Sequence, residues 1–86
     1  MNIQITWIRL VPGNSTLKAT VSLLIENQLA IHDIKVIDTG EKLFVAMPSR
    51  PDNGGKFRDV VHPISAELRA IINDEILSAY YAELTK

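Results

Sequence analysis

Apolar and polar residues alternate along the first two thirds of the chain, with the period of a half-buried β-strand. Apolar residues at positions 3, 5 and 7 predict a strand from Asn2 to Val11. The clearest alternation runs from Leu17 to Ile25, after a turn at Pro12–Ser15. The polar residues Glu26–Gln28 are short enough for a hairpin connection to a third strand, Leu29–Ile37. These segments indicate an antiparallel meander.

The alternation changes phase inside the third strand. Leu29 and Ile31 have odd positions, whereas Ile34 and Val36 have even ones. Because one additional residue in a strand produces such a shift, we expect a β-bulge near His32–Asp33.

A second turn, Asp38–Glu41, precedes a fourth strand expected from Leu43 to Met47 and ended by Pro48. Residues 49–56 contain one proline, two glycines and an Asn-Gly pair, a composition typical of an exposed and mobile loop. Phe57–Val61 is a candidate for a short fifth strand at the edge of the sheet.

The hydrophobic period changes to about 3.6 residues after Pro63, as in an amphipathic helix. Ser65 is expected to cap this helix, and Glu67 in the first turn suits the positive end of the helix dipole. No glycine or proline interrupts residues 65–84, so one helix of about five turns is expected. Its predicted apolar stripe consists of Leu68, Ile71, Ile72, Ile76, Ala79 and Tyr80. The predicted fold class is therefore α+β, an antiparallel four- to five-stranded meander sheet with one C-terminal helix.

The length of 86 residues has room for one domain, expected to span residues 1–86. A domain this short buries only about 60–65% of the surface of its unfolded chain. Open sheet edges invite pairing with a second copy, and a helix leaving through residues 49–56 could pack on a neighbour. We therefore expect a homodimer or a higher oligomer, formed through a sheet edge with a swapped helix as a further contact.

The location and redox environment follow from what the sequence lacks. It has no cysteine, so disulfides and thiolate metal sites are excluded. The first residues alternate instead of forming the apolar block of a signal peptide, and no apolar run approaches the roughly 20 residues of a membrane span. A cytoplasmic location without a membrane partner is expected.

Candidate catalytic chemistry is sparse. His32 and His62 lack the spacing of metal ligands, so hydrogen-bonding roles are expected for both. The Gly54–Lys56 segment lacks the other glycine and the Ser or Thr of a phosphate-binding loop, and no serine-nucleophile motif is present. We expect no enzyme, catalytic residue, metal, cofactor or small-molecule substrate.

The aromatic residues are expected to serve mainly in packing. Trp7 falls on the side of the first strand assigned to the core, and Phe44 is expected in the core as well. Tyr81 lies off the helix stripe and is the best candidate for an exposed or interface position.

The charge balance restricts nucleic-acid binding to a local patch. Nine Lys and Arg residues stand against ten Asp and Glu residues, a net charge of -1, and sequence-independent binding requires cations that neutralise phosphates. Residues 50–69 form the only positive segment, with four basic and three acidic residues. Its candidate nucleic-acid-binding residues are Arg50, Lys56, Arg58 and Arg69. The alternative is ordinary solvated surface charge, with a local ion pair between Arg58 and Asp59.

Three blocks in order, His32–Asp38, Leu43–Ser49 and Phe57–Ile64, resemble the SpoVG family, the stage V sporulation protein G family. The resemblance covers nearly the whole chain. It implies a small α+β protein that dimerises through its sheet, with no enzymatic activity and no cofactor. It also implies a regulator of sporulation and asymmetric septation, and of gene expression through DNA and RNA binding.

The chain departs from the family pattern at two basic positions. Arg50 is followed by Pro51 where the family typically has a Lys-Arg pair, and Ile71 stands where a basic residue is common. Arg69 matches the family, and Lys56 adds a positive charge where an acidic residue is frequent. Two functions remain open: a homo-oligomeric regulator that binds DNA and RNA, and a protein-interaction module that acts on division or sporulation machinery without nucleic acid.

Overall fold

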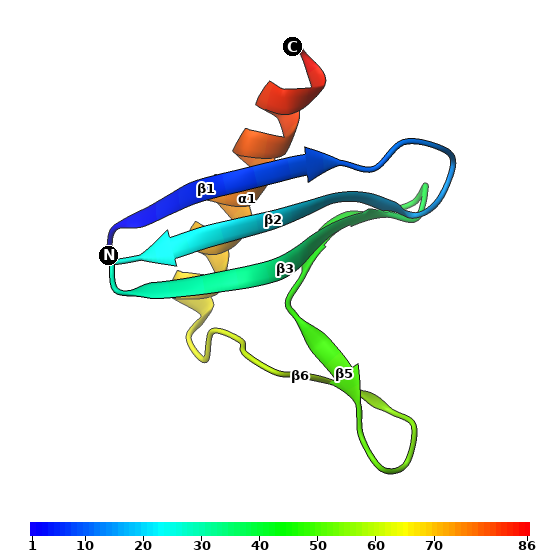
Figure 1. Cartoon of the computed structure of the whole chain (residues 1–86), viewed down its shortest axis with the longest axis vertical. Helices are drawn as coiled ribbons and strands as arrows, with labels where there is room; N and C mark the ends of the chain where they lie inside the picture. The colour runs from blue at the N-terminus through cyan, green and yellow to red at the C-terminus, as the bar shows by residue number, and fades with distance from the viewer.

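The computed structural model describes residues 1–86 and contains two antiparallel sheets and one helix (Figure 1). The larger sheet has the strand order β1 (Ile3–Leu10), β2 (Leu17–Ile25), β3 (Leu29–Asp38) and β4 (Leu43–Ala46). The smaller sheet pairs β5 (Ser49–Pro51) with β6 (Phe57–Asp59), and α1 (Ala66–Leu84) follows. The predicted α+β class, with a meander and a C-terminal helix, is confirmed.

The core lies between one face of the larger sheet and α1, which runs behind the strands in Figure 1. Alternate residues of β2 and β3 point into it, among them Leu23 and Ile34, both fully buried. From α1 come Ile72, Ile76 and Tyr80. Burying each such side chain stabilises the fold by about 1.5–3 kcal/mol. The predicted helix stripe is confirmed in these residues and in Leu68, with one exposed exception.

That exception is Ile71, which is 41% exposed. It is adjacent to Ile72 on the helix, and the 100° step between neighbouring residues turns its side chain away from the sheet. The half-buried Leu77, absent from the predicted stripe, packs against the core instead.

The bulge predicted in β3 is confirmed by the pairing register. Leu23 is opposite Ile31, whereas Val21 is opposite Ile34, so β3 has one more residue than β2 in this interval. Asp33 takes the left-handed backbone conformation with φ 64°. The extra residue keeps both Ile31 and Ile34 on the core face.

A second bulge in β1 reverses the prediction for Trp7. Ile5 is opposite Leu23 and Trp7 is opposite Ser22, which leaves Thr6 as an additional residue. The strand therefore changes phase, and Trp7 lies on the face away from α1 with 50% of its surface exposed. The prediction of a core position for Trp7 was wrong.

Phe44 also lies outside the core. It is opposite Ile37 in the β3–β4 ladder, while the neighbouring pair Val36 and Val45 faces the helix. Because side chains alternate between faces, Phe44 is on the outer face, where it is half-buried. Its predicted core position was likewise wrong.

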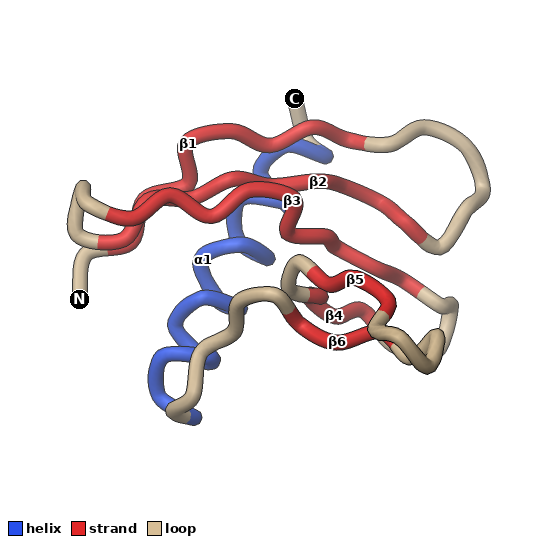
Figure 2. Tube along the Cα trace, turned by 60° about the horizontal axis from the view of Figure 1, so that its bottom comes forward, coloured by secondary structure: helices blue, strands red, loops and turns tan.

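The segment 49–56 is more ordered than the predicted loop. Ser49–Pro51 pairs as β5 with β6, and only residues 52–56 form the turn between them. The strand expected from Phe57 to Val61 is shorter and does not join the larger sheet, which therefore has four strands. Figure 2 shows this hairpin following β4, with the chain then leading from β6 to the start of α1.

The start of α1 is fixed by the predicted cap. Ser65 has extended backbone angles, and its Oγ accepts a hydrogen bond of 3.1 Å from the backbone N–H of Leu68. Such a cap satisfies one of the free N–H groups in the first helical turn. The helix is not long and apolar enough to cross a membrane.

Candidate nucleic-acid interface

Three of the four predicted basic residues lie on the β5–β6 hairpin. Arg50 and Arg58 are opposite each other in its ladder, and Lys56 ends the turn. All three are exposed. The hairpin projects from the larger sheet (Figure 1), so these cations are open to a large partner.

Asp52 organises the turn of the hairpin. Its Oδ1 accepts hydrogen bonds from the backbone N–H groups of Gly54 at 2.8 Å and Lys56 at 3.1 Å. Gly55 has φ 83°, a conformation that glycine adopts without strain. The main chain closes the turn through the N–H of Asp52, which donates to the carbonyl of Lys56 at 2.8 Å.

The second carboxylate oxygen of Asp52 holds Arg58. The Nε–H of Arg58 donates to Asp52 Oδ2 at 2.7 Å. This bond, aided by the N–H groups of Gly54 and Lys56, lowers the pKa of Asp52 below its ordinary value. The ion pair predicted between Arg58 and Asp59 is therefore wrong in its acidic partner. Arg58 has its charge offset within the hairpin, whereas Arg50 and Lys56 form no ion pair.

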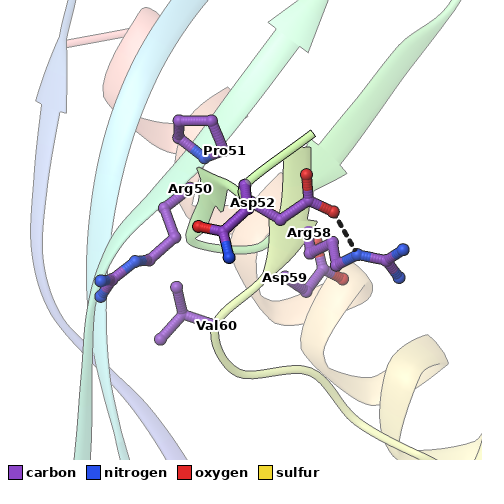
Figure 3. A pocket seen from close by; sticks show the side chains of 7 residues that line it. Arg50, Pro51, Asp52, Arg58, Asp59 and Val60 are labelled. Atoms are coloured by element: carbon purple, nitrogen blue, oxygen red, sulfur yellow. Dashed lines mark hydrogen bonds and ion pairs between the residues drawn. The ribbon is translucent and has the colours of Figure 1, made fainter. Parts of the chain in front are cut away.

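A shallow polar depression lies beside this ion pair (Figure 3). In Figure 3 the guanidinium groups of Arg50 and Arg58 point apart, with that of Arg50 on the side of Val60. The residues that line the depression are Arg50, Pro51, Asp52, Asn53, Arg58, Asp59 and Val60. An anion bound here would meet the unpaired guanidinium of Arg50. It would also meet that of Arg58, for which it would compete with Asp52.

Arg69 belongs to a different element from the other three candidates. It lies on an exposed part of the first turns of α1, and its Nη2 donates to the carbonyl of Pro63 at 3.4 Å. Residues 60–68 lie between it and the hairpin along the chain. The structure therefore groups Arg50, Lys56 and Arg58 in one hairpin and leaves Arg69 at the helix start.

Both histidines make hydrogen bonds, as predicted. His32 Nδ1 is 2.9 Å from Ser22 Oγ on the outer face of the sheet, and His62 Nδ1 is 3.2 Å from the carbonyl oxygen of Pro63. No group of three or more His, Cys, Asp and Glu residues is placed to hold a metal ion.

Sequence reasoning missed the cations of the outer sheet face. Arg9 is opposite Thr20, which alternates with the buried residues of β2, so Arg9 faces away from the helix. Lys35 is opposite the same Thr20 from the other side. The sequence does contain a sign of this arrangement. The apolar positions of β1 are odd at its start, 3 and 5, and even at its end, 8 and 10, a change of phase like that in β3.

Comparison with known proteins identifies the family. The model of the SpoVG family matches residues 1–82. The septation protein SpoVG of Clostridioides difficile is 41% identical over 86 residues, covering 100% of this chain and 94% of that protein. The septation protein SpoVG of Agathobacter rectalis is 44% identical over 84 residues, covering 95% and 97%. That of Acetivibrio thermocellus is 45% identical over 80 residues, covering 93% and 85%. With a family match over nearly its whole length and relatives this similar along theirs, the chain belongs to the SpoVG family.

Proposed function

We propose that this protein is a regulator of septation and sporulation that binds DNA, and RNA as well, as a homo-oligomer. The septation role rests on the family and on the names of its relatives. Nucleic-acid binding rests on the β5–β6 hairpin, and in particular on Arg50 and Lys56, which are exposed and form no ion pair. Unpaired exposed cations are the groups that neutralise phosphates.

Oligomerisation compensates for the low charge of one chain. The hairpin carries three basic residues and two acidic ones, Asp52 and Asp59, so one copy offers little net positive charge. Two copies related by symmetry would present eight basic groups when Arg69 is included. The free edge of β1 supports pairing with another copy, because its backbone groups are open on one side and its sequence contains no proline.

Exposed apolar residues near the hairpin give a second reason to expect self-association. Phe57, Val60 and Ile64 are all exposed, and Ile64 is 95% exposed. Several large apolar side chains exposed in one short segment indicate a surface that another chain covers, because their exposure to water is unfavourable.

Fluorescence anisotropy of labelled duplex DNA, measured at several salt concentrations, tests the proposal. If four to six phosphates are neutralised, log K falls against log salt with a slope of about -4 to -5. The variant R50A should weaken binding to all sequences alike and make the slope shallower by about 1, because a phosphate contact carries no sequence information. A matched control is K86Q, since Lys86 pairs with Glu83 at the far end of α1. A flat salt response, or equal effects of both variants, contradicts binding at the hairpin.

A protein-interaction module is the second candidate function. The same β1 edge could receive a segment of the division or sporulation machinery by strand addition, and the exposed Ile64 offers an apolar contact outside the sheet. A pull-down after nuclease treatment separates the two functions. Retention of one defined protein partner, together with absence of binding in the anisotropy assay, favours this alternative.

A further inference from the structure

The face of the larger sheet that turns away from α1 is not covered by any element of the chain (Figure 1). Two rows of side chains cross its middle. In the first, Trp7 of β1 is opposite Ser22 of β2, and Ser22 is hydrogen-bonded to His32 of β3 at 2.9 Å. Trp7 is half exposed while Ser22 is buried, so the exposed indole lies beside the hydrogen-bonded pair of Ser22 and His32.

The second row supplies positive charge. Thr20 of β2 is opposite Arg9 on one side and Lys35 on the other. Neighbouring strands are about 4.8 Å apart, which places the backbones of Arg9 and Lys35 about 10 Å from each other across the sheet. Neither Arg9 nor Lys35 forms an ion pair.

The rest of this face adds positive charge and little negative charge. Lys42 places its ammonium group 5.6 Å from the ring centroid of Phe44, at the edge formed by β4. The residues paired in register on this face include no carboxylate; the nearest along β3 is Asp33, in the bulge beside His32. An exposed aromatic ring, hydroxyl groups and unpaired cations therefore share a single surface.

We propose that this open face binds single-stranded nucleic acid, with an unpaired base stacked on Trp7 and the phosphates on Arg9 and Lys35. Base stacking on exposed aromatic rings beside a positive groove is how strands are held without regard to sequence. A duplex cannot use the indole in this way, since its bases are stacked on one another. This inference rests on the proposed function. It names single-stranded nucleic acid as a ligand and the outer sheet face as a second binding surface beside the hairpin.

Charge argues against a second copy as the occupant. A two-fold interface places the same patch on both sides. Arg9 and Lys35 of one copy would then face like cations of the other, with no carboxylate in register to offset them. A polyanion has the complementary charge.

The test uses the fluorescence of Trp7, the only tryptophan in the chain. An oligothymidylate of about 12 nucleotides should quench it in proportion to binding, and a blunt duplex should not. Replacing the indole in W7L should weaken oligothymidylate binding, followed by anisotropy, about 5- to 150-fold, whereas W7F, which keeps a stacking ring, should retain most of it. The double variant R9Q/K35Q should reduce the salt slope by about 1.4, at about 0.7 for each phosphate of a single strand.

The control is Y81L, which removes an exposed aromatic ring from the helix. Equal losses in W7L and Y81L overturn the inference. So does a Trp7 emission that shifts to the blue with protein concentration alone, since that would place a second copy on this face. Duplex binding at the hairpin without quenching of Trp7 by oligothymidylate refutes the inference and leaves the proposed function standing. If neither the oligothymidylate nor the duplex binds, both the inference and the proposed nucleic-acid binding are refuted.

Discussion

The ion pair between Arg58 and Asp52 determines how much charge the hairpin can offer. Asp52 Oδ2 accepts from the Nε–H of Arg58, while Oδ1 holds the turn through two backbone N–H groups. The variant D52N keeps an oxygen acceptor for the turn and removes the anion that holds Arg58. It should therefore release Arg58 for phosphate binding and raise nucleic-acid affinity.

The size of this effect follows from counterion release. One further phosphate contact steepens the slope of log K against log salt by about 0.9, which corresponds to about a 3.5-fold greater loss of affinity between 50 and 200 mM salt. Anisotropy titrations of one duplex with wild-type protein and D52N, at four or more salt concentrations, measure the difference directly.

The matched control is D59N. Asp59 lies on the same hairpin, opposite Ser49, but forms no ion pair. Both variants remove one negative charge, so their effect on the general attraction of the hairpin for DNA is alike. Only D52N frees an arginine. If D59N steepens the salt slope as much as D52N, the reasoning that Asp52 restrains Arg58 is refuted.

Three further predictions concern the fold and its titration. The variant I76A, which truncates a fully buried helix residue, should lower the free energy of unfolding by about 2–5 kcal/mol, measured by urea denaturation; a loss no larger than that of an exposed I71A would contradict the core assignment. The variant S65A should cost about 1 kcal/mol through loss of the helix cap, and S65D should restore most of it in the same assay; equal stability of the two variants would exclude the cap. In an NMR titration the Asp52 carboxyl should have a pKa below its ordinary value, chiefly because of the hydrogen bond from Arg58, and R58A should move it upward. Because the pKa is depressed in the folded state, the contribution of Asp52 to stability is complete above its ordinary pKa and is lost as the pH falls through the folded value. An unchanged titration in R58A would show that the ion pair does not set it.

The sequence predicts the elements whose pattern is long and regular. The strand Leu17–Ile25 has the predicted bounds, because its alternation continues over nine residues. Ser65 caps α1 as predicted, since a hydroxyl residue before an uninterrupted helical pattern has few other roles. The bulge at His32–Asp33 was also predictable, as only an added residue reconciles the apolar positions on its two sides.

The features that were missed depend on spatial neighbours more than on periodicity. The bulge in β1 was overlooked because Ile3, Ile5 and Trp7 form a regular series, and only the continuation to Ile8 and Leu10 shows the change of phase. Strands of three residues, such as β5 and β6, are too short to have a period at all. Three of the candidate basic residues lie close together in the sequence, and the structure places them on one hairpin, but the choice of Asp52 over Asp59 as partner of Arg58 follows from the shape of the turn.

The hairpin has its own ladder, its own turn and no strand in common with the larger sheet, and a single hydrogen bond from the Val60 N–H to the Pro48 carbonyl closes its base. Residues 49–59 can therefore be exchanged as a cassette. Substitutions there should cost little folding stability, because the residues of the hydrophobic core lie elsewhere. Diversification of this protein, in nature or in the laboratory, should proceed fastest at that cassette.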